Sequence, residues 1–334
     1  MDQLLSVRDL RLTLPGQGGR IAPVDGVSFD IGRGECVGLV GESGCGKSLT
    51  AQTLIGLTRY LPRSRAGGAA LWRPEPGAKE RDLIRLGEQE LSRLRGRQIS
   101  MVFQDPLSSL NPLLRVDYQI REVLAKHLGL KGGAAQKRVV ELLDSVGIPE
   151  PAMRARQYPH QLSGGLRQRA LLSVALAGDP KLLIADEPTT ALDVTVQAQI
   201  LRELKRLLTA SGMSILFITH DLGVIAQLCD RVMVMYAGRI VESAPTAQFF
   251  RNTRHPYSKG LLASLPSLAA VGRELTSIPG SPPQPGAYPP GCRFEPRCPV
   301  AIDQCRQAYP ELREDGSHPV SCYVAWRKAA SGIE

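Results

Sequence analysis

The sequence predicts an α/β fold built on a mostly parallel sheet. Four short apolar runs rich in branched side chains have the length and composition of buried strands, at 35–40, 98–103, 181–186 and 214–220. Helical patterns lie between them. Because strands that alternate with helices are joined by crossover connections, this order is typical of parallel strands covered by helices.

The predicted helices follow from amphipathic spacing and from their end signals. One covers 47–57, directly after the first strand, and another covers 163–178, before the third. A third covers 194–212 and ends on Gly212, a residue that suits the left-handed position after a helix.

Antiparallel strands are expected on both sides of this core. The segments 6–14 and 24–34 predict two strands that meet through a glycine-containing turn, and 231–243 predicts a hairpin that turns at Gly238. The fold class is therefore α/β, with a core built on a mostly parallel sheet and an antiparallel β subdomain.

Two regions change character along the chain. Residues 106–160 combine proline-rich loops with amphipathic helices, which predicts an inserted helical subdomain. From about residue 246 the chain is rich in Pro, Gly and Cys, which predicts a small, loop-rich module. We therefore expect one domain at 1–245 and a second at 246–334.

Composition limits the classes of protein. Hydrophobic residues make up 43% of the 334 residues and charged residues 22%, as in a globular protein. No apolar run reaches the roughly 18–20 residues that a membrane helix needs, and the first residues lack the pattern of a signal peptide. We expect a cytosolic protein whose thiols stay reduced.

The formal net charge of +9 is concentrated in one segment. Between Arg59 and Gln98 there are ten Lys or Arg and five Asp or Glu, which leaves +5. Aromatic residues that stack on bases are scarce there. A solvated basic surface insertion is the interpretation that this pattern favours over a nucleic-acid site.

The most specific motif is GESGCGKS, at residues 41–48. It matches G-x-x-x-x-G-K-[ST] and lies between a predicted strand and a predicted helix, which is the context that the motif requires. Its glycines allow backbone N–H groups to face phosphates, and Lys47 and Ser48 are suited to the phosphates and to Mg²⁺. The residues predicted to bind the nucleotide here are Gly41, Glu42, Ser43, Gly44, Cys45, Gly46, Lys47, Ser48 and Leu49.

Two further strings carry candidate chemistry. KLLIADEPTTALD places Asp186 at the end of a strand, where a carboxylate lies beside the Mg²⁺, and Glu187 next to it can polarise an attacking water. QLSGGLRQR offers Ser163 as a helix cap and Gly164 and Gly165 for close approach to an anion. Taken alone, the first is also explained by a strand end with a proline turn, and the second by an ordinary cap.

Together these strings resemble the ATP-binding-cassette (ABC) ATPase family over about residues 1–245. The phosphate loop, LSGG, IADEPT and TALD occur in the family's order. Gln104, after the strand at 98–103, matches the family's glutamine loop, and His220 in FITHD matches its switch histidine. A lone histidine at a strand end is otherwise more often structural.

The resemblance implies a role for each matching residue. Two cassettes would close head to tail around two ATP molecules, each held by one chain's phosphate loop and the other chain's Ser163, Gly164 and Gly165. Glu187 would be the general base, and His220 would contact the γ-phosphate. The remaining implied roles are a dimer-seam contact for Asp193 and Mg²⁺ ligation by Ser48, Gln104 and Asp186.

One position departs from the family pattern. The family usually stacks adenine on an aromatic residue near the end of the first strand, and the matching position in this sequence is Leu14. The resemblance therefore does not say how adenine is held.

Longer stretches, including ISMVFQDPLSSLNP and RHPYSKGLLASLP, resemble the peptide-importer branch, which serves dipeptides, oligopeptides or nickel. The likeness is greatest to dipeptide systems. It implies two membrane permease subunits that dock on the helical insertion, a second homologous ATPase in a heterodimer, and indirectly an extracytoplasmic solute-binding protein. The chain would be peripheral, at the cytoplasmic face of the inner membrane.

Other functions fit the sequence less well. A nickel or other small-solute importer of the same branch remains an alternative. A soluble ABC ATPase acting on DNA or ribosomes usually has two cassettes or long insertions, and nucleic acid is not expected as a partner of this chain. A non-hydrolysing subunit would lack Glu187, His220 or the LSGG string, all of which are present.

Four cysteines gather near the end of the sequence, at Cys292, Cys298, Cys305 and Cys322. Their spacing lacks the tight pair of most zinc sites. All-thiolate ligation and the Cys-Pro step at Cys298 also suit a 4Fe–4S cluster. Spacing alone leaves iron–sulfur, zinc and free thiols open; the resemblance to the importer branch implies the 4Fe–4S cluster.

Three further cysteines lie in the core of the sequence. Cys36 falls in a predicted strand and Cys229 in an apolar helical stretch, and both are expected to be buried free thiols. Cys45 lies within the phosphate loop near a helix N-terminus, which is expected to lower its pKa. We therefore expect modification of Cys45 to block ATP binding.

Overall fold

A computed structural model of the chain describes residues 2–189, 193–265, 277–313 and 316–331. Within these residues the larger sheet has six strands in the order β10-β9-β3-β8-β7-β6, and all its pairs are parallel except β9–β10. The predicted α/β class is confirmed. The strands are β3 (Cys36–Val40), β6 (Ile99–Val102), β7 (Leu182–Asp186), β8 (Ser214–Thr219), β9 (Arg231–Tyr236) and β10 (Arg239–Pro245).

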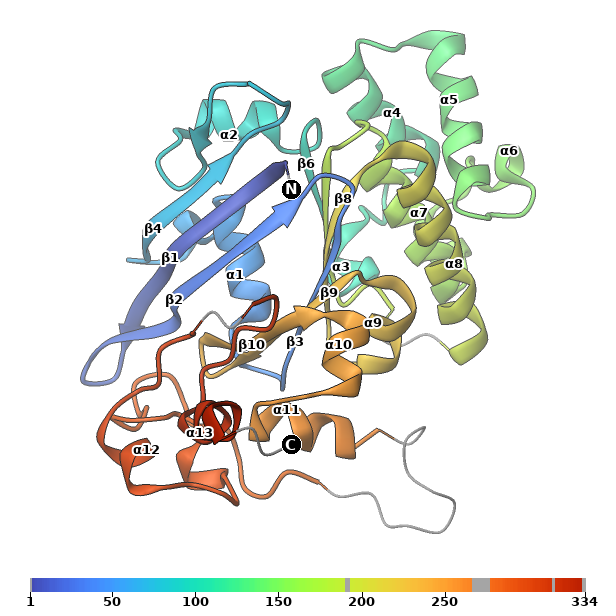
Figure 1. Cartoon of the computed structure of the whole chain (residues 1–334). Helices are drawn as coiled ribbons and strands as arrows, with labels where there is room; N and C mark the ends of the chain where they lie inside the picture. The colour runs from blue at the N-terminus through green and yellow to red at the C-terminus, as the bar shows by residue number, and fades with distance from the viewer. Residues whose placement is uncertain (1, 190–192, 266–276, 314–315, 332–334) are drawn as a thin grey trace.

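A second, antiparallel sheet lies beside the first (Figure 1). In the described chain its order is β2-β1-β4-β5, and β1 and β2 form one long hairpin that turns after Gly16. Both predicted N-terminal strands are confirmed, and each is longer than expected. The strands are β1 (Gln3–Gly16), β2 (Gly19–Gly32), β4 (Arg65–Trp72) and β5 (Arg81–Asp82).

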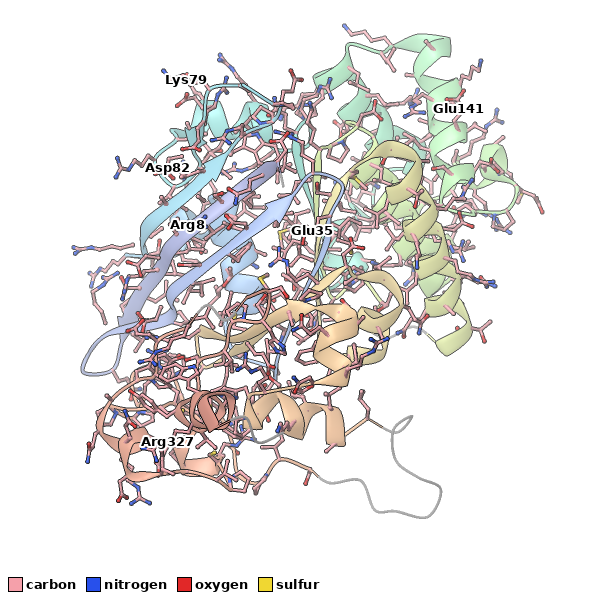
Figure 2. The ribbon with its side chains drawn as sticks, viewed as in Figure 1. Arg8, Glu35, Lys79, Asp82, Glu141 and Arg327 are labelled. Atoms are coloured by element: carbon pink, nitrogen blue, oxygen red, sulfur yellow. The ribbon has the colours of Figure 1, made fainter. Side chains whose placement is uncertain are left out.

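The basic segment 59–98 differs from its interpretation as a surface insertion. Strand β4 pairs with β1, and the side chain of Trp72 is fully buried, with its indole N–H donating to Gln98. Many of the segment's charges have local partners, such as Arg73 with Glu80. Lys79 and Asp82 lie on the outer side of this region (Figure 2). Strand β4 therefore belongs to the fold, and apart from Arg65 the charged residues of the segment lie outside this strand.

Helices cover both faces of the larger sheet (Figure 1). Because strands buried on both faces need apolar side chains in both directions, Leu182 and Ile184 of β7 pack into one core cluster and Leu183 and Ala185 into the other. Helices near the core are α1 (Lys47–Leu54), η1 (Leu57–Tyr60), α2 (Glu88–Leu94), α7 (Gly164–Leu176), α8 (Val194–Ser211), α9 (Leu222–Leu228) and α10 (Thr246–Arg251).

The predicted helical insertion forms a group of helices at one end of the molecule (Figure 1). Buried residues of α4 and α5, such as Ile120 and Val139, join the core cluster that also contains Leu171 of α7. Its elements are α3 (Pro106–Ser109), α4 (Val116–Leu128), α5 (Gly132–Ser145), α6 (Pro151–Arg154) and η2 (Pro159–Gln161).

The C-terminal segment packs on the edge of the larger sheet. Backbone hydrogen bonds join Ser243 to Pro319 and Ser321 to Val241, so this segment extends the sheet beyond β10. Figure 2 shows Arg327 in this part of the molecule. Its helices are α11 (Pro256–Ala263), η3 (Glu295–Arg297), α12 (Asp303–Gln307) and α13 (Tyr323–Ser331).

Among the helices of the described residues, none has both the length and the apolar character that crossing a bilayer requires.

Candidate nucleotide site

The phosphate loop connects the end of β3 with the start of α1. Gly44 and Gly46 adopt left-handed φ angles of 79° and 107°, which L side chains rarely tolerate. A Cβ atom on Gly46 would also lie 2.5 Å from the carbonyl oxygen of Pro23. Both positions therefore require glycine, and the loop turns tightly into the helix N-terminus as an anion-binding loop does.

Lys47 folds back over this loop. Its side chain donates hydrogen bonds from Nζ to the carbonyl oxygens of Gly41 at 2.8 Å and Glu42 at 3.1 Å. The residue is only 5% exposed. The ammonium group therefore lies at the centre of the loop, where a bound phosphate chain would meet it.

Ser48 and Asp186 meet across the gap between α1 and the end of β7. The Ser48 hydroxyl donates to Asp186 Oδ1 at 3.0 Å, although the two residues are 138 positions apart. Burial raises the pKa of the Asp186 carboxyl, while the hydrogen bond from Ser48 lowers it. This hydroxyl–carboxylate pair is the donor set that Mg²⁺ prefers when phosphates complete the coordination.

Three polar side chains converge next to this pair. Glu187 Oε2 lies 3.3 Å from Gln104 Nε2 and 3.3 Å from His220 Nδ1. The three residues follow β7, β6 and β8, which are neighbours in the sheet. Because carboxyl ends of parallel strands share one edge, ligands of such sheets bind there. The structure thus brings together the candidates that sequence spacing placed far apart.

The backbone of Glu187 is held in an uncommon conformation. Its φ angle is +47°, and its N–H donates to the carbonyl oxygen of Ile218 at 2.9 Å. Non-glycine residues in this region carry local strain of roughly 1–3 kcal/mol, which surrounding structure must offset. The bond to β8 keeps the Glu187 carboxylate aimed at His220.

The LSGG residues lie elsewhere in the single chain. Ser163 caps α7 by accepting a hydrogen bond from Leu166 N–H at 3.4 Å, and Asp193 caps α8 by accepting from Val196 N–H at 2.9 Å. A Cβ atom on Gly164 would meet open space, whereas one on Gly165 would lie 2.7 Å from Val196. Among the described residues no hydrogen bond joins Ser163 or Asp193 to the phosphate loop. The rest of the TALD string, 190–192, lies outside the described residues.

Two residues that sequence reasoning did not assign to the site contact the phosphate loop. The hydroxyl of Tyr257 accepts a hydrogen bond from Glu42 N–H at 2.8 Å. The guanidinium of Arg297 donates to both carboxylate oxygens of Glu42, at 2.7 and 2.9 Å. In the sequence, Tyr257 is part of the HPY segment, and Arg297 directly precedes Cys298. These positions were the only features that could have drawn attention to the two residues.

The expectation for Cys45 is wrong in one respect. Burial raises the pKa of its thiol, although the nearby Lys47 ammonium opposes this effect. The residue is 2% exposed. Desolvation of the thiolate therefore outweighs the helix N-terminus, and the thiol is neither acidic nor accessible.

Cys36 and Cys229 are confirmed as buried thiols, with their sulfur atoms 3.5 Å apart. Cys229 lies just after α9 rather than inside a helix. Leu14, at the position expected for adenine stacking, pairs with Ile21 in the antiparallel sheet and is partly buried against the core.

The four C-terminal cysteines are near one another but do not form a metal site as they lie. Burial and the neighbouring Cys305, Cys322 and Cys298 raise the pKa of Cys292 to about 12. Cys292 N–H donates to the carbonyl oxygen of Cys305 at 2.7 Å. In the described part of the chain no three His, Cys, Asp or Glu side chains are arranged to hold a metal ion. Burial also raises the pKa of the Cys298 and Cys322 thiols. The predicted cluster ligands are therefore neighbours, but the described residues do not show them arranged as a metal site.

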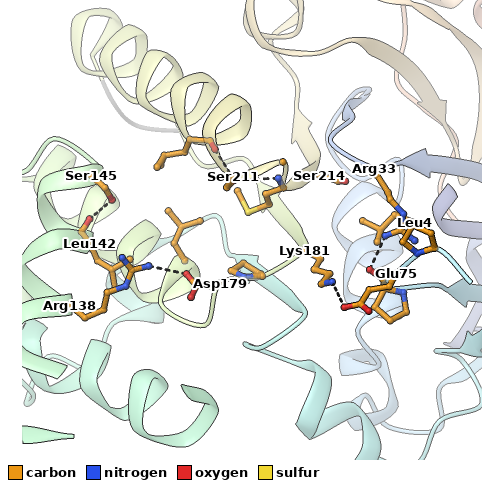
Figure 3. A pocket seen from close by; sticks show the side chains of 17 residues that line it. Leu4, Arg33, Glu75, Arg138, Leu142, Ser145, Asp179, Lys181, Ser211 and Ser214 are labelled. Atoms are coloured by element: carbon orange, nitrogen blue, oxygen red, sulfur yellow. Dashed lines mark hydrogen bonds and ion pairs between the residues drawn. The ribbon is translucent and has the colours of Figure 1, made fainter. Parts of the chain in front are cut away.

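A cavity of about 560 Å³ lies at the opposite end of the sheet (Figure 3). Its charged side chains are paired, with Lys181 bound to Glu75 at 2.9 Å and Arg138 bound to Asp179 at 2.9 Å. Lys181 precedes β7, so the cavity faces the amino ends of the parallel strands. Its cations are therefore already engaged by carboxylates, and the cavity is separate from the nucleotide site.

Comparison with known proteins supports the geometry. Residues 24–190 match the family described as ABC transporter, and residues 241–305 match the oligopeptide/dipeptide transporter C-terminal region. The dimeric structure of MJ0796, a bacterial ABC transporter cassette, matches with a TM-score of 0.63 and 27% identity, covering 72% of this chain and 98% of that one.

Similar curated proteins span nearly the whole chain. The dipeptide transport ATP-binding protein DppD of Bacillus subtilis (strain 168) is 46% identical over 335 residues, covering 100% of this chain and 98% of the relative. The oligopeptide transport ATP-binding protein OppD of the same organism is 47% identical, covering 96% of this chain and 89% of the relative. This chain therefore belongs to the ABC transporter family, as an ATPase that carries the oligopeptide/dipeptide transporter C-terminal region.

Proposed function

We propose that this chain hydrolyses ATP to power the uptake of dipeptides or oligopeptides through membrane permeases. The observation that carries the proposal is the convergence of Gln104, Glu187 and His220 beside the Ser48–Asp186 pair and the phosphate loop. The names of the similar curated proteins supply the class of cargo. A nickel or other small-solute importer of the same branch is the alternative for the cargo.

The proposed chemistry is phosphoryl transfer to water. The loop amides and Lys47 would hold the β and γ phosphates. Ser48, Asp186 and Gln104 would hold Mg²⁺, which would neutralise the charge that develops on the phosphate oxygens. Glu187 accepts the proton of the attacking water, and His220 holds the γ-phosphate end in place. The work of these residues is positioning and electrostatic stabilisation.

A second cassette completes each site in this proposal. Ser163, Gly164 and Gly165 would reach the ATP that is bound by a homologous partner ATPase, and Asp193 would line the seam between the two. The open space in front of Gly164 supports this arrangement, because a phosphate can approach the helix N-terminus there without meeting a side chain.

The proposed membrane partners are two permease subunits that dock on the helical subdomain. A cavity of about 620 Å³ opens between this subdomain and the sheet, lined in part by Phe103, Ser108 and Val123. Leu113 and Tyr118, also in the subdomain, are 82% and 45% exposed. A groove and exposed apolar side chains on the same subdomain suit a short helix of a partner. Gln104, next to Phe103, would then report permease movement to the site.

This arrangement places the chain as a peripheral subunit at the cytoplasmic face of the inner membrane, with an extracytoplasmic solute-binding protein acting indirectly. Nucleic acid is not a proposed partner, because the basic segment has few aromatic residues that could stack on bases. Some of its cations also pair with carboxylates of the same segment, as Arg95 does with Glu88. A soluble ABC ATPase acting on DNA or ribosomes is the alternative of another class. It would give nucleic-acid-stimulated ATP hydrolysis and no dependence of uptake on this chain.

Uptake of a labelled dipeptide by native cells tests the proposal. Cells that carry Glu187→Gln are expected to lose uptake, because the general base is removed while the fold is kept. Glu141→Gln is the matched control, since it makes the same chemical change on an outward-facing position of α5 (Figure 2). Wild-type uptake in the Glu187→Gln cells would contradict the proposal. Loss of labelled nickel uptake in place of dipeptide uptake would favour the alternative cargo.

We also propose that Cys292, Cys298, Cys305 and Cys322 hold a 4Fe–4S cluster. Support comes from the all-thiolate donor set and from the mutual proximity of the four residues in one loop-rich module. Protein purified without oxygen should contain about four iron and four sulfide per chain. Cys298→Ser should lower both and Cys36→Ser should not. Zinc without sulfide in the wild-type protein would refute the proposal.

A further inference from the structure

We infer that Arg297 and Tyr257, from the C-terminal module, are positioning residues of the phosphate loop that set the affinity of the site for ATP. The inference rests on the nucleotide site described above. It gives the C-terminal module a role at the phosphate loop, in addition to the proposed binding of a cluster by its four cysteines.

The contact of Arg297 with the loop has the geometry of a specific ion pair. Its guanidinium binds both oxygens of the Glu42 carboxylate, and the Arg297 side chain is only 5% exposed. Such a bidentate pair neutralises the carboxylate and also fixes its orientation, and a lysine ammonium does not reproduce this geometry. The two residues are 255 positions apart, so the pair exists only when the module is docked.

Arg297 is itself held rigidly. Its Nε donates to the carbonyl oxygen of Pro279 at 2.8 Å, and a second nitrogen donates to the hydroxyl of Tyr236 at 3.3 Å. Arg297 is the last residue of η3 and directly precedes Cys298. The position of the guanidinium is therefore set by the fold of the cysteine-bearing segment.

Tyr257 fixes the backbone of the same loop residue. Its hydroxyl accepts the hydrogen bond from Glu42 N–H, so this amide is directed toward the module. The Tyr257 ring is fully buried and packs against Tyr236 and Phe294, with ring centroids 4.6 and 5.4 Å away. Loop shape at Glu42 is thus determined by a side chain that belongs to α11.

Electrostatics give the ion pair a consequence for ATP. Glu42 places a carboxylate on the loop that must receive the negatively charged phosphates of ATP. Like charges on neighbouring groups repel, so a free carboxylate there would oppose ATP binding. Arg297 neutralises that carboxylate and turns it toward the module. Without Arg297, the Glu42 carboxylate is free to face the incoming phosphates, and ATP affinity falls.

The test is equilibrium binding of a non-hydrolysable ATP analogue with Mg²⁺ to the full chain. Arg297→Ala should weaken binding about tenfold, and Arg297→Lys should weaken it less because the charge is kept. Arg306→Ala is the matched control, because Arg306 forms an exposed pair with Glu295 in the same module. It should bind like the wild type.

The double variant Glu42→Ala/Arg297→Ala separates the charge effect from a merely structural role. If Arg297 acts by neutralising Glu42, removing both should restore affinity to within about threefold of Glu42→Ala alone. If the double variant binds as weakly as Arg297→Ala, or if Arg297→Ala binds like the wild type, the inference is overturned. This comparison stays decisive even where Arg297→Ala lowers stability.

Tyr257→Phe tests the backbone contact with the ring retained. Loss of one hydrogen bond to the loop should weaken binding about threefold to tenfold, whereas Tyr323→Phe, a buried ring away from the loop, should not. Equal affinities for Tyr257→Phe and the wild type would remove Tyr257 from the inference. Lys47→Ala should abolish binding of the analogue and serves as the reference for a site that does not work. If the wild type binds no more analogue than Lys47→Ala does, the proposed nucleotide site is refuted, and not only the role of Arg297.

Discussion

His255 makes the stability of the C-terminal module depend on pH. The residue is 1% exposed and is the N-cap of α11, where its Nδ1 accepts a hydrogen bond from Tyr257 N–H at 3.1 Å. Burial lowers the pKa of the imidazole to about 4, although the Glu242 carboxylate opposes this shift. Protonation of Nδ1 would also remove the acceptor that Tyr257 N–H needs. His255 is therefore held neutral in the folded chain.

The size of the effect follows from the two pKa values. Between about pH 6.5 and pH 4 the unfolded chain binds a proton at this histidine and the folded chain does not, so the free energy of unfolding falls as pH falls. Between pH 7.5 and pH 5.0 the loss amounts to about 2 kcal/mol. Glu242 has a lowered pKa, so its stabilising charge is lost only as pH falls below about 4.5, outside this window.

Urea unfolding of the full chain at pH 7.5 and 5.0 measures this loss. His255→Asn keeps an oxygen acceptor at the helix start but does not titrate, so its unfolding free energy should lose about 2 kcal/mol less than that of the wild type over this range. His160→Asn, on an exposed histidine, is the control and should behave like the wild type. The same pH dependence in His255→Asn and the wild type would refute the reasoning.

Three further predictions concern single side chains. Trp72→Ala should lower the free energy of unfolding by about 3–5 kcal/mol, because it empties a fully buried site; a loss below about 1 kcal/mol in denaturant titration would contradict it. Cys45, buried and with a raised pKa, should react with iodoacetamide at pH 8 far more slowly in the folded chain than in urea, and equal rates would count against its burial. Ser163→Ala should cost about 1 kcal/mol of unfolding free energy and Ser163→Asn much less, since only the first removes the cap of α7; equal losses would exclude that role.

Much of the site could be predicted because its signals are local. The spacing of glycines, Lys47 and Ser48 defines a loop whose shape depends on neighbouring residues. Asp186, Glu187 and His220 each follow an apolar run, and ends of parallel strands must meet at one edge of the sheet. The long antiparallel hairpin and the helix ending at Gly212 were likewise visible in short-range patterns.

The remaining features depend on long-range packing. Strand β4 contains the run AGGAA, which has no apolar alternation, so its pairing with β1 left no local signal. The raised pKa of Cys45 results from burial by distant segments, which spacing does not reveal. Tyr257 and Arg297 lie 215 and 255 residues from Glu42, and only the docked module brings them to the loop.

ATP turnover by Glu187→Gln, compared with the wild type in the assembled importer, tests the central claim most directly. The account predicts that turnover falls by roughly 10²–10⁴-fold while the affinity for ATP changes little, because only the acceptor of the water proton is lost. Turnover close to that of the wild type would show that the proton goes elsewhere, and would contradict the role of the Glu187 carboxylate as the general base.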